Sequence, residues 1–254
     1  MSQDIDQERR QFVSVAGLAA AATVVAPGAF LLDGSAEAGS RREPAVDKVR
    51  YGMFIDTTKC ADGCTECVTA CEKENGIDLL RMPEGADPEE WDRQRPRWMR
   101  TVKVKDRLTG RVSNLPMMCQ HCEHPPCVDV CPTGASFRRA DGIVMVDRHI
   151  CIGCRYCMMA CPYKARSFIH ENVDQQLSIA PRGKGCVESC NFCVHRRDNG
   201  ENTTACQDAC SHGAIVFGDL NDSNSEVSKV LREKDNTQLR ADLKLNTSVR
   251  YCGI

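Results

Sequence analysis

Aromatic side chains and long apolar runs are scarce in this sequence. Phe, Trp and Tyr supply 5% of its 254 residues, which argues against an interior organised mainly by aromatic packing. Beyond residue 38, no apolar run reaches the about 20 residues that a membrane-spanning helix needs. We therefore expect a mature chain that is soluble or peripheral to a membrane.

A strong charge of either sign is also missing. The chain has 33 Lys and Arg against 35 Asp and Glu, a formal net charge of −2, which is no footprint of nucleic-acid binding. It contains no C-x-x-C-H motif and no dinucleotide or P-loop glycine pattern. We expect no nucleic-acid partner, no covalently attached haem and no nucleotide site of these types.

The first 38 residues are typical of an export signal. Arg9 and Arg10 precede an apolar run rich in Ala and Val, and "AEA" at positions 36–38 offers a small-residue cleavage site. We predict a twin-arginine signal peptide over 1–38, a route that exports folded proteins, and hence a periplasmic protein. An ordinary secretory signal or a retained anchor is the alternative, and Glu8 departs from the usual twin-arginine pattern.

Cysteine is the residue present in excess, with 18 copies. Sixteen of them fall into four runs, and Cys186 and Cys252 are left over, either paired as a disulfide or both free. Run one is Cys60, Cys64, Cys67 and Cys71; run two is Cys119, Cys122, Cys127 and Cys131; run three is Cys151, Cys154, Cys157 and Cys161; run four is Cys190, Cys193, Cys206 and Cys210.

Run three has the spacing of a ferredoxin. "CIGCRYCMMACP" reads C-x2-C-x2-C-x3-C-P, in which the fourth cysteine serves the neighbouring cluster. Three thiolates on one tight loop can hold three irons of a cube, and the fourth then points toward a second cube. Pro132 and Pro162 turn the chain after the last cysteine of runs two and three. Gly153 allows the backbone to pass close to the sulfurs.

Two other uses of the cysteines fit less well. Zinc sites usually combine two C-x2-C pairs across a longer loop, so three cysteines within seven residues are poor zinc spacing. A disulfide scaffold fits an exported chain in principle, but steps this short would need many strained loops. The spacing therefore favours four [4Fe-4S] clusters.

"CQHCEHPPCVDVCPTGA" followed by "CIGCRYCMMACPYKAR" resembles the iron-sulfur subunit of the complex iron-sulfur molybdoenzyme group, over roughly residues 50 to 220. The resemblance implies an electron-transfer subunit in which runs one and four pair, as do runs two and three, with exchanged fourth ligands. The implied ligand sets are Cys60, Cys64, Cys67 and Cys210 (first set); Cys71, Cys190, Cys193 and Cys206 (second set); Cys119, Cys122, Cys127 and Cys161 (third set); Cys131, Cys151, Cys154 and Cys157 (fourth set).

Runs one and four depart from the family pattern. "CADGCTEC" has one extra residue between its first two cysteines, and Ser211 stands where a proline is usual. Cys186 precedes Cys190 with the same gap that separates Cys60 from Cys64, so Cys186 is a competing ligand. The alignment of "SCNFCVHRR" with the family's fourth motif leaves Cys186 spare.

The remaining pattern indicates an α+β fold of two ferredoxin-like halves, each holding two [4Fe-4S] clusters, with the second half inserted into the first. We expect residues 39–115 plus 180–220 to form one half, 116–179 the inserted half and 221–254 a tail that wraps across the surface or reaches a partner. Strands are expected over 51–56 and 97–106, the latter returning as a hairpin through 107–111, with a second hairpin around Asp141–Gly142. Helices are expected over 68–75 and within 224–234.

Several charged and soft side chains lie near the cysteines. We expect most of the basic ones to be solvated, although they could offset the negative charge of the clusters. They are Lys59, Lys73, Arg138, Arg139, Arg155, Lys164, Arg166, Arg196 and Arg197. Met158 and Met159 are expected to shield a cluster from water, and His121 and His195 to be packed or exposed rather than to tune a potential.

These features predict a one-electron carrier without a substrate pocket. The resemblance implies a polytopic quinone-interacting membrane subunit and a cytochrome or catalytic redox subunit as partners. More narrowly, the chain resembles the periplasmic iron-sulfur subunit of the membrane complex associated with dissimilatory sulfite reductase. The alternative is the electron-transfer subunit of a periplasmic molybdoenzyme such as tetrathionate or polysulfide reductase. An enzyme with an open iron is less favoured, because every run supplies four thiolates and no catalytic base is evident. A structural cluster module is less favoured because four clusters are excessive for scaffolding.

Overall fold

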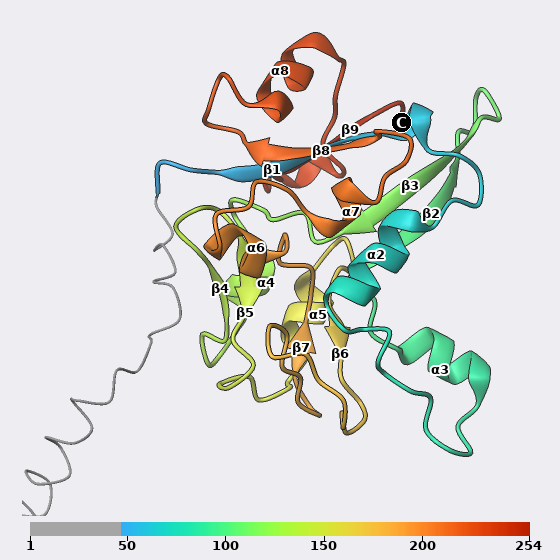
Figure 1. The fold of residues 1–254 in the computed structure, drawn as a ribbon, viewed down its shortest axis with the longest axis vertical. Helices are drawn as coiled ribbons and strands as arrows, with labels where there is room; N and C mark the ends of the chain where they lie inside the picture. The colour runs from blue at the N-terminus through green and yellow to red at the C-terminus, as the bar shows by residue number, and fades with distance from the viewer. Residues whose placement is uncertain (1–46) are drawn as a thin grey trace, which may run out of the picture. The chain divides into compact units, whose positions relative to one another are not determined.

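The computed structural model describes residues 47–254, and the expected signal peptide lies outside them. A three-stranded sheet forms the upper part of the view in Figure 1, in the order β8-β1-β9. Strand β1 (Tyr51–Asp56) pairs antiparallel with β8 (Ile215–Asp219) and parallel with β9 (Val249–Cys252). The strand expected over 51–56 is confirmed.

The C-terminal tail differs from the sequence-based expectation. Rather than lying only on the surface, it returns to the sheet, and Val249 and Tyr251 of β9 are fully buried. The Tyr251 hydroxyl donates to the Pro116 carbonyl oxygen at 3.0 Å. The expectation that the tail wraps across the surface does not hold for Val249–Cys252, because these residues of alternating polarity pair with β1 and complete the sheet.

Three two-stranded ribbons complete the β structure. Strands β2 (Met99–Lys105) and β3 (Val112–Met118) form the first expected hairpin, and β4 (Ser136–Arg138) and β5 (Val144–Val146) form the second, with Gly142 at φ +86° in its turn. Strand β6 (Ser167–Phe168) pairs with β7 (Val187–Glu188), which follows it after a long loop. The mixed α and β content agrees with the expected class.

The helices are short and begin near cysteines or at capping side chains. They are α2 (Glu66–Glu74), α3 (Pro88–Gln94), α4 (Pro126–Asp129), α5 (Tyr156–Ala160), α6 (Val194–Asp198), α7 (Ala205–Asp208) and α8 (Glu226–Glu233), with 3-10 turns η1 (Thr57–Lys59) and η2 (Ala241–Leu243). Helix α2 ends before Gly76, whose φ of +62° suits glycine, and Ser225 caps α8 through its side-chain oxygen. Both expected helices are present.

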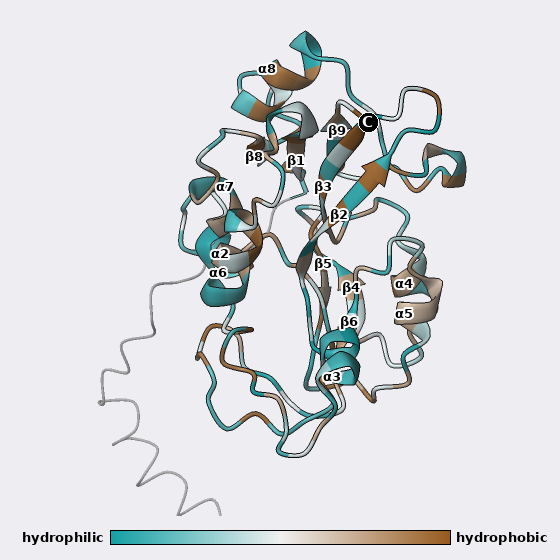
Figure 2. Ribbon diagram, turned by 90° about the vertical axis from the view of Figure 1, so that its right-hand side faces the viewer, coloured by the Kyte–Doolittle hydropathy of each residue, from teal (hydrophilic) through white to brown (hydrophobic). Residues whose placement is uncertain are grey.

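The core of the described part of the chain consists of two apolar clusters. The first joins buried residues of β1, β8 and β9 to cysteines of runs one and four, and the second gathers cysteines of runs two and three around Val144 and Phe168. Helix α2 packs against α7, and α4 packs against α5. In Figure 2 the sheet strands carry apolar colour, whereas α3 and α6 are largely polar. The fold thus brings the cysteine runs together in pairs.

Candidate cluster sites

Four cysteines line a common cavity in each of three cases. The first set lines a space of about 370 Å³ together with Ile215. The second set lines a space of about 330 Å³, and the third set one of about 320 Å³ that also includes Arg166. Within residues 47–254, no three side chains of ligand type lie close enough to hold a single metal ion. The cysteines surround a volume rather than a point.

The fourth set lies nearer the surface. Cys157 is buried, Cys131 and Cys151 are partly exposed, and Cys154 is exposed. Burial raises the pKa of the Cys157 thiol, the nearby Arg166 opposes this, and the neighbouring thiols of Cys151 and Cys131 add to it. The thiol of Cys127, from the third set, also raises the pKa of Cys157, so Cys157 lies electrostatically between the third and fourth sets.

Burial raises the pKa of several cavity-lining thiols and so favours their protonated form. Burial, with the neighbouring Cys210 as the next cause, raises the pKa of Cys60 to about 11 and that of Cys67 to about 12. Burial likewise raises the pKa of Cys206 to about 12. Because thiolates are the metal-binding form, loading these sites must release protons.

Left-handed backbone conformations shape the cysteine loops. His121 (φ 43°), Arg155 (φ 64°) and Phe192 (φ 53°) each lie between two cysteines of a C-x2-C step. Gly153 (φ 68°) cannot be replaced without movement, since a Cβ atom would lie 2.1 Å from the Gly185 carbonyl oxygen. These turns direct successive thiols toward one side, at a conformational cost that the packed surroundings offset.

Backbone and side-chain donors reach the sulfurs. The Ser136 amide donates to Cys131 Sγ at 3.3 Å, and the Ala214 amide donates to Cys210 Sγ at 3.3 Å. Arg166 Nη2 donates to a third-set thiol at 3.1 Å. Hydrogen bonds to sulfur are among the factors that set iron-sulfur potentials. These donors would therefore influence the reduction potential of a cluster bound by the cysteines.

His121 is packed, as expected. It is fully buried, its ring stacks on Phe192 with centroids 3.7 Å apart, and its Nδ1 accepts a hydrogen bond from the Val144 amide at 3.0 Å. Burial, aided by the Arg166 charge, lowers the pKa of His121 to about 3, so the ring is neutral. His195 is partly buried and lies 2.7 Å from Glu74 Oε1.

Three flanking side chains differ from expectation. Most of the basic residues near the cysteines are exposed or partly exposed, but Arg166 is 5% and Arg197 is 7% exposed. Met158 packs against the second apolar cluster, whereas Met159 is 74% exposed and shields no site. Sequence position alone could not distinguish these cases, because burial depends on elements distant along the chain.

Cys186 and Cys252 are both free, so the disulfide alternative is wrong. Cys186 Sγ donates to the Arg148 carbonyl oxygen at 3.3 Å and neighbours Cys151, whereas Cys252 ends β9 opposite Asp56.

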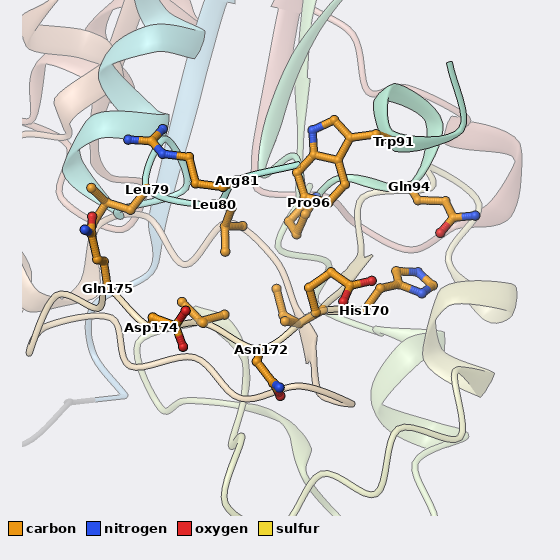
Figure 3. A pocket seen from close by; sticks show the side chains of 13 residues that line it. Leu79, Leu80, Arg81, Trp91, Gln94, Pro96, His170, Asn172, Asp174 and Gln175 are labelled. Atoms are coloured by element: carbon orange, nitrogen blue, oxygen red, sulfur yellow. The ribbon is translucent and has the colours of Figure 1, made fainter. Parts of the chain in front are cut away.

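A further cavity among the described residues is lined by no cysteine. About 640 Å³ lies between two chain segments, 79–96 and 169–175, whose side chains approach from opposite sides in Figure 3. Trp91 and Leu80 supply apolar surface, and Asp174 supplies a carboxylate. This cavity gathers no thiols, in contrast to the three cysteine-lined spaces described above.

None of the helices in the described part of the chain is both long and apolar enough to span a membrane.

Several known proteins are similar to this chain over most of its length. A family model described as a 4Fe-4S dicluster domain matches residues 111–220. Similar proteins include the Hdr-like menaquinol oxidoreductase iron-sulfur subunit 1 of Archaeoglobus fulgidus, 40% identical over 97% of this chain and 98% of that protein. Protein NrfC of Escherichia coli is 39% identical over 89% of this chain and 86% of its own length. A tetrathionate reductase subunit of Salmonella typhimurium is 34% identical over 91% of this chain and 81% of its own length.

Proposed function

Because the chain belongs to the family of iron-sulfur electron-transfer subunits of quinol oxidoreductase complexes, we propose that it relays single electrons through four [4Fe-4S] clusters. The observation that carries this proposal is the enclosure of three cavities by four cysteines each. When bound, the clusters supply one-electron storage between adjacent oxidation states.

We assign the ligands by the four sets. The first, second and third sets each contain a cysteine from a second run, Cys210, Cys71 and Cys161 respectively, that completes the cavity lining. Thiol chemistry and enclosure both fit an iron-sulfur cube, since four sulfur ligands and a dry lining are what such a group needs. The fourth set would follow the same exchanged pattern through Cys131.

The fourth set offers the point of electron exchange with a partner. Cys154 is the exposed cysteine among the described residues, and its loop leaves large apolar side chains in solvent. These side chains are Ile150 (48% exposed), Ile152 (67%), Tyr156 (58%) and Met159 (74%). Apolar surface beside a redox site favours docking to another protein. The partner at this surface is a polytopic quinone-interacting membrane subunit, as the menaquinol oxidoreductase relative supports.

The setting we propose is periplasmic, after twin-arginine export, with a cytochrome or catalytic redox subunit as the second partner and a role in dissimilatory sulfur metabolism. The alternative is the electron-transfer subunit of a periplasmic molybdoenzyme, which the similarity to the tetrathionate reductase protein favours. Purification of the intact complex separates the two. Haem subunits without molybdopterin support the first, and a large molybdopterin subunit supports the second.

Iron and acid-labile sulfide analysis of anaerobically purified protein tests the relay itself. We expect about sixteen irons and about sixteen sulfides per chain, with interacting reduced-cluster EPR signals during a redox titration. About twelve irons would mean that one set holds no complete cluster. Zinc in place of iron would overturn the proposal.

A further inference from the structure

Arg166 lies between two of the cysteine sets. Its Nη2 atom donates to Cys127 Sγ at 3.1 Å, and it lines the cavity of the third set. Its charge also interacts with Cys119 of that set and with Cys157 of the fourth. With 5% exposure, the side chain has little solvent to screen it. Its field therefore acts on both sites at short range.

Two of its donors have no partner in the protein. Arg166 Nε and Nη1 are buried, and neither finds an acceptor among the described residues. Burying a charged donor without an acceptor costs folding free energy. We therefore expect acceptors for these donors inside the cavity. The thiolates and sulfides of an iron-sulfur cube are acceptors of that kind. The orphaned donors thus fit a cluster in the third set.

The first set has an apolar residue at the matching place. Arg166 stands five residues after Cys161, and Ile215 stands five residues after Cys210. Ile215 is 4% exposed and lines the cavity of the first set, as Arg166 lines that of the third. The two sites share their local plan but differ in charge and in hydrogen-bond donors.

We propose that Arg166 raises the reduction potential of the cluster held by Cys119, Cys122, Cys127 and Cys161. The proposal rests on the ligand sets of the proposed function. Reduction adds one electron, supplied by a redox partner, and makes the cluster more negative. A nearby guanidinium stabilises that added charge through its positive charge and its N–H donors, while arginine itself stays protonated throughout. The third set then becomes a favoured resting place for an electron in the relay.

EPR-monitored redox titration of anaerobically purified full-length protein tests this role. The component that disappears in Cys122→Ala identifies the third-set cluster. In Arg166→Met we expect its potential to fall by 59 mV or more, a tenfold change in the one-electron reduction equilibrium. In Arg166→Lys we expect a smaller fall in the same direction, because lysine keeps the charge but loses the planar fork of donors.

Arg100→Met is the matched control. Arg100 donates to the carbonyl oxygens of Lys164 at 2.8 Å and Tyr163 at 3.0 Å, so it supports the same loop without a recorded contact to sulfur. We expect its third-set potential to stay within a twofold change of the reduction equilibrium. A shift equal to that of Arg166→Met would assign the effect to loop movement and overturn the proposal.

Iron content separates the two proposals. About sixteen irons per chain in the wild type with unchanged potentials in Arg166→Met overturns the role of Arg166 and leaves the relay intact. Few irons in the wild type overturns the relay. If Arg166→Met loses iron, the third-set potential of Arg166→Lys is measured instead. A potential equal to that of the wild type would overturn the proposed role of the Arg166 hydrogen bonds.

Discussion

The surroundings of runs one and four differ from those of runs two and three, although both regions follow the same plan of cysteines. In the first region, Ile215 of β8 lines the cavity of the first set, and Met53 of β1 lines that of the second. In the second region, a buried arginine lines the third set, and the fourth set reaches solvent at Cys154. Similar loops can therefore hold sites of different polarity and exposure. The spacing of the cysteines predicts the ligand sets, whereas packing decides the polarity and the solvent exposure of each set.

One contact between the two regions is aromatic. Phe192, from run four, stacks on His121, from run two, and meets Phe217 of β8 edge-on at 5.1 Å between centroids. Arg139 of the second region adds a paired contact with Asp198 of α6, with atoms 2.8 and 3.2 Å apart. Because these contacts join the two regions, we expect the stability of one region to depend on the other.

The largest expected effect comes from removing a ligand in one region only. Cys122→Ala should eliminate the third-set cluster, lowering iron by about four per chain, and weaken the fourth-set cluster that shares runs two and three. Iron analysis and EPR measure both. Cys252→Ala is the control and should retain all iron, since Cys252 belongs to no set. Loss of all iron from a folded Cys122→Ala chain would show that the two regions do not load separately.

Removing the aromatic contact tests the coupling between regions. Phe192 is 1% exposed, so Phe192→Ala should lower the free energy of unfolding by about 3–5 kcal/mol. Anaerobic denaturant unfolding measures this. Phe192→Leu, which keeps most of the volume, should cost less than about 1.5 kcal/mol. Equal, small effects of both variants would mean that the contact contributes little.

A charged contact within the first region should contribute less. Glu74 of α2 accepts from Arg196 Nε at 2.6 Å and Nη2 at 2.8 Å, and this partner lowers the pKa of Glu74 to about 2. Glu74→Gln should cost about 2 kcal/mol of unfolding free energy at neutral pH. The lowered pKa of Glu74 stabilises the folded protein fully at pH values above the ordinary carboxyl pKa of about 4.3. This stabilisation is lost as the pH falls through about 2. The difference from the wild type should therefore be present at neutral pH and shrink as the pH falls from about 4.3 toward about 2, and a difference that persists at pH 2 would contradict its assignment to the Glu74 carboxylate.

The smallest expected effect concerns the serine that stands where runs two and three have a proline. The Ser211 amide donates to Glu66 Oε2 at 3.2 Å, and its hydroxyl donates to the same atom at 2.7 Å. Ser211→Pro removes both donors, so we expect a small decrease in the unfolding temperature, below that of Glu74→Gln. Ser211→Ala, which keeps the amide, should decrease it less. An increase in Ser211→Pro would show that the turn prefers proline in both regions.

Local patterns account for the parts of the structure that were predicted correctly. The hairpin around Asp141–Gly142 and the helix after Ser225 depend on turn and capping residues only a few positions apart. The residues missed by the sequence reasoning all depend on remote contacts. From its sequence context, Arg166 is similar to several solvated basic residues, yet it is buried. Met159 was expected to shield a cluster from water, yet it is exposed. For Arg166, the only sequence signal was its position five residues after Cys161.

The sequence by itself determined which cysteines fall together in runs, because the spacing between them is a local property of the chain. It also determined the strands and helices whose periodicity and caps are local. Only the tertiary structure decided that the last strand joins β1, with Phe54 opposite Arg250, and that the Arg166 guanidinium donates to a thiol. Those outcomes depend on packing between segments far apart in the chain, where the burial of one side chain is decided by all the others that cover it.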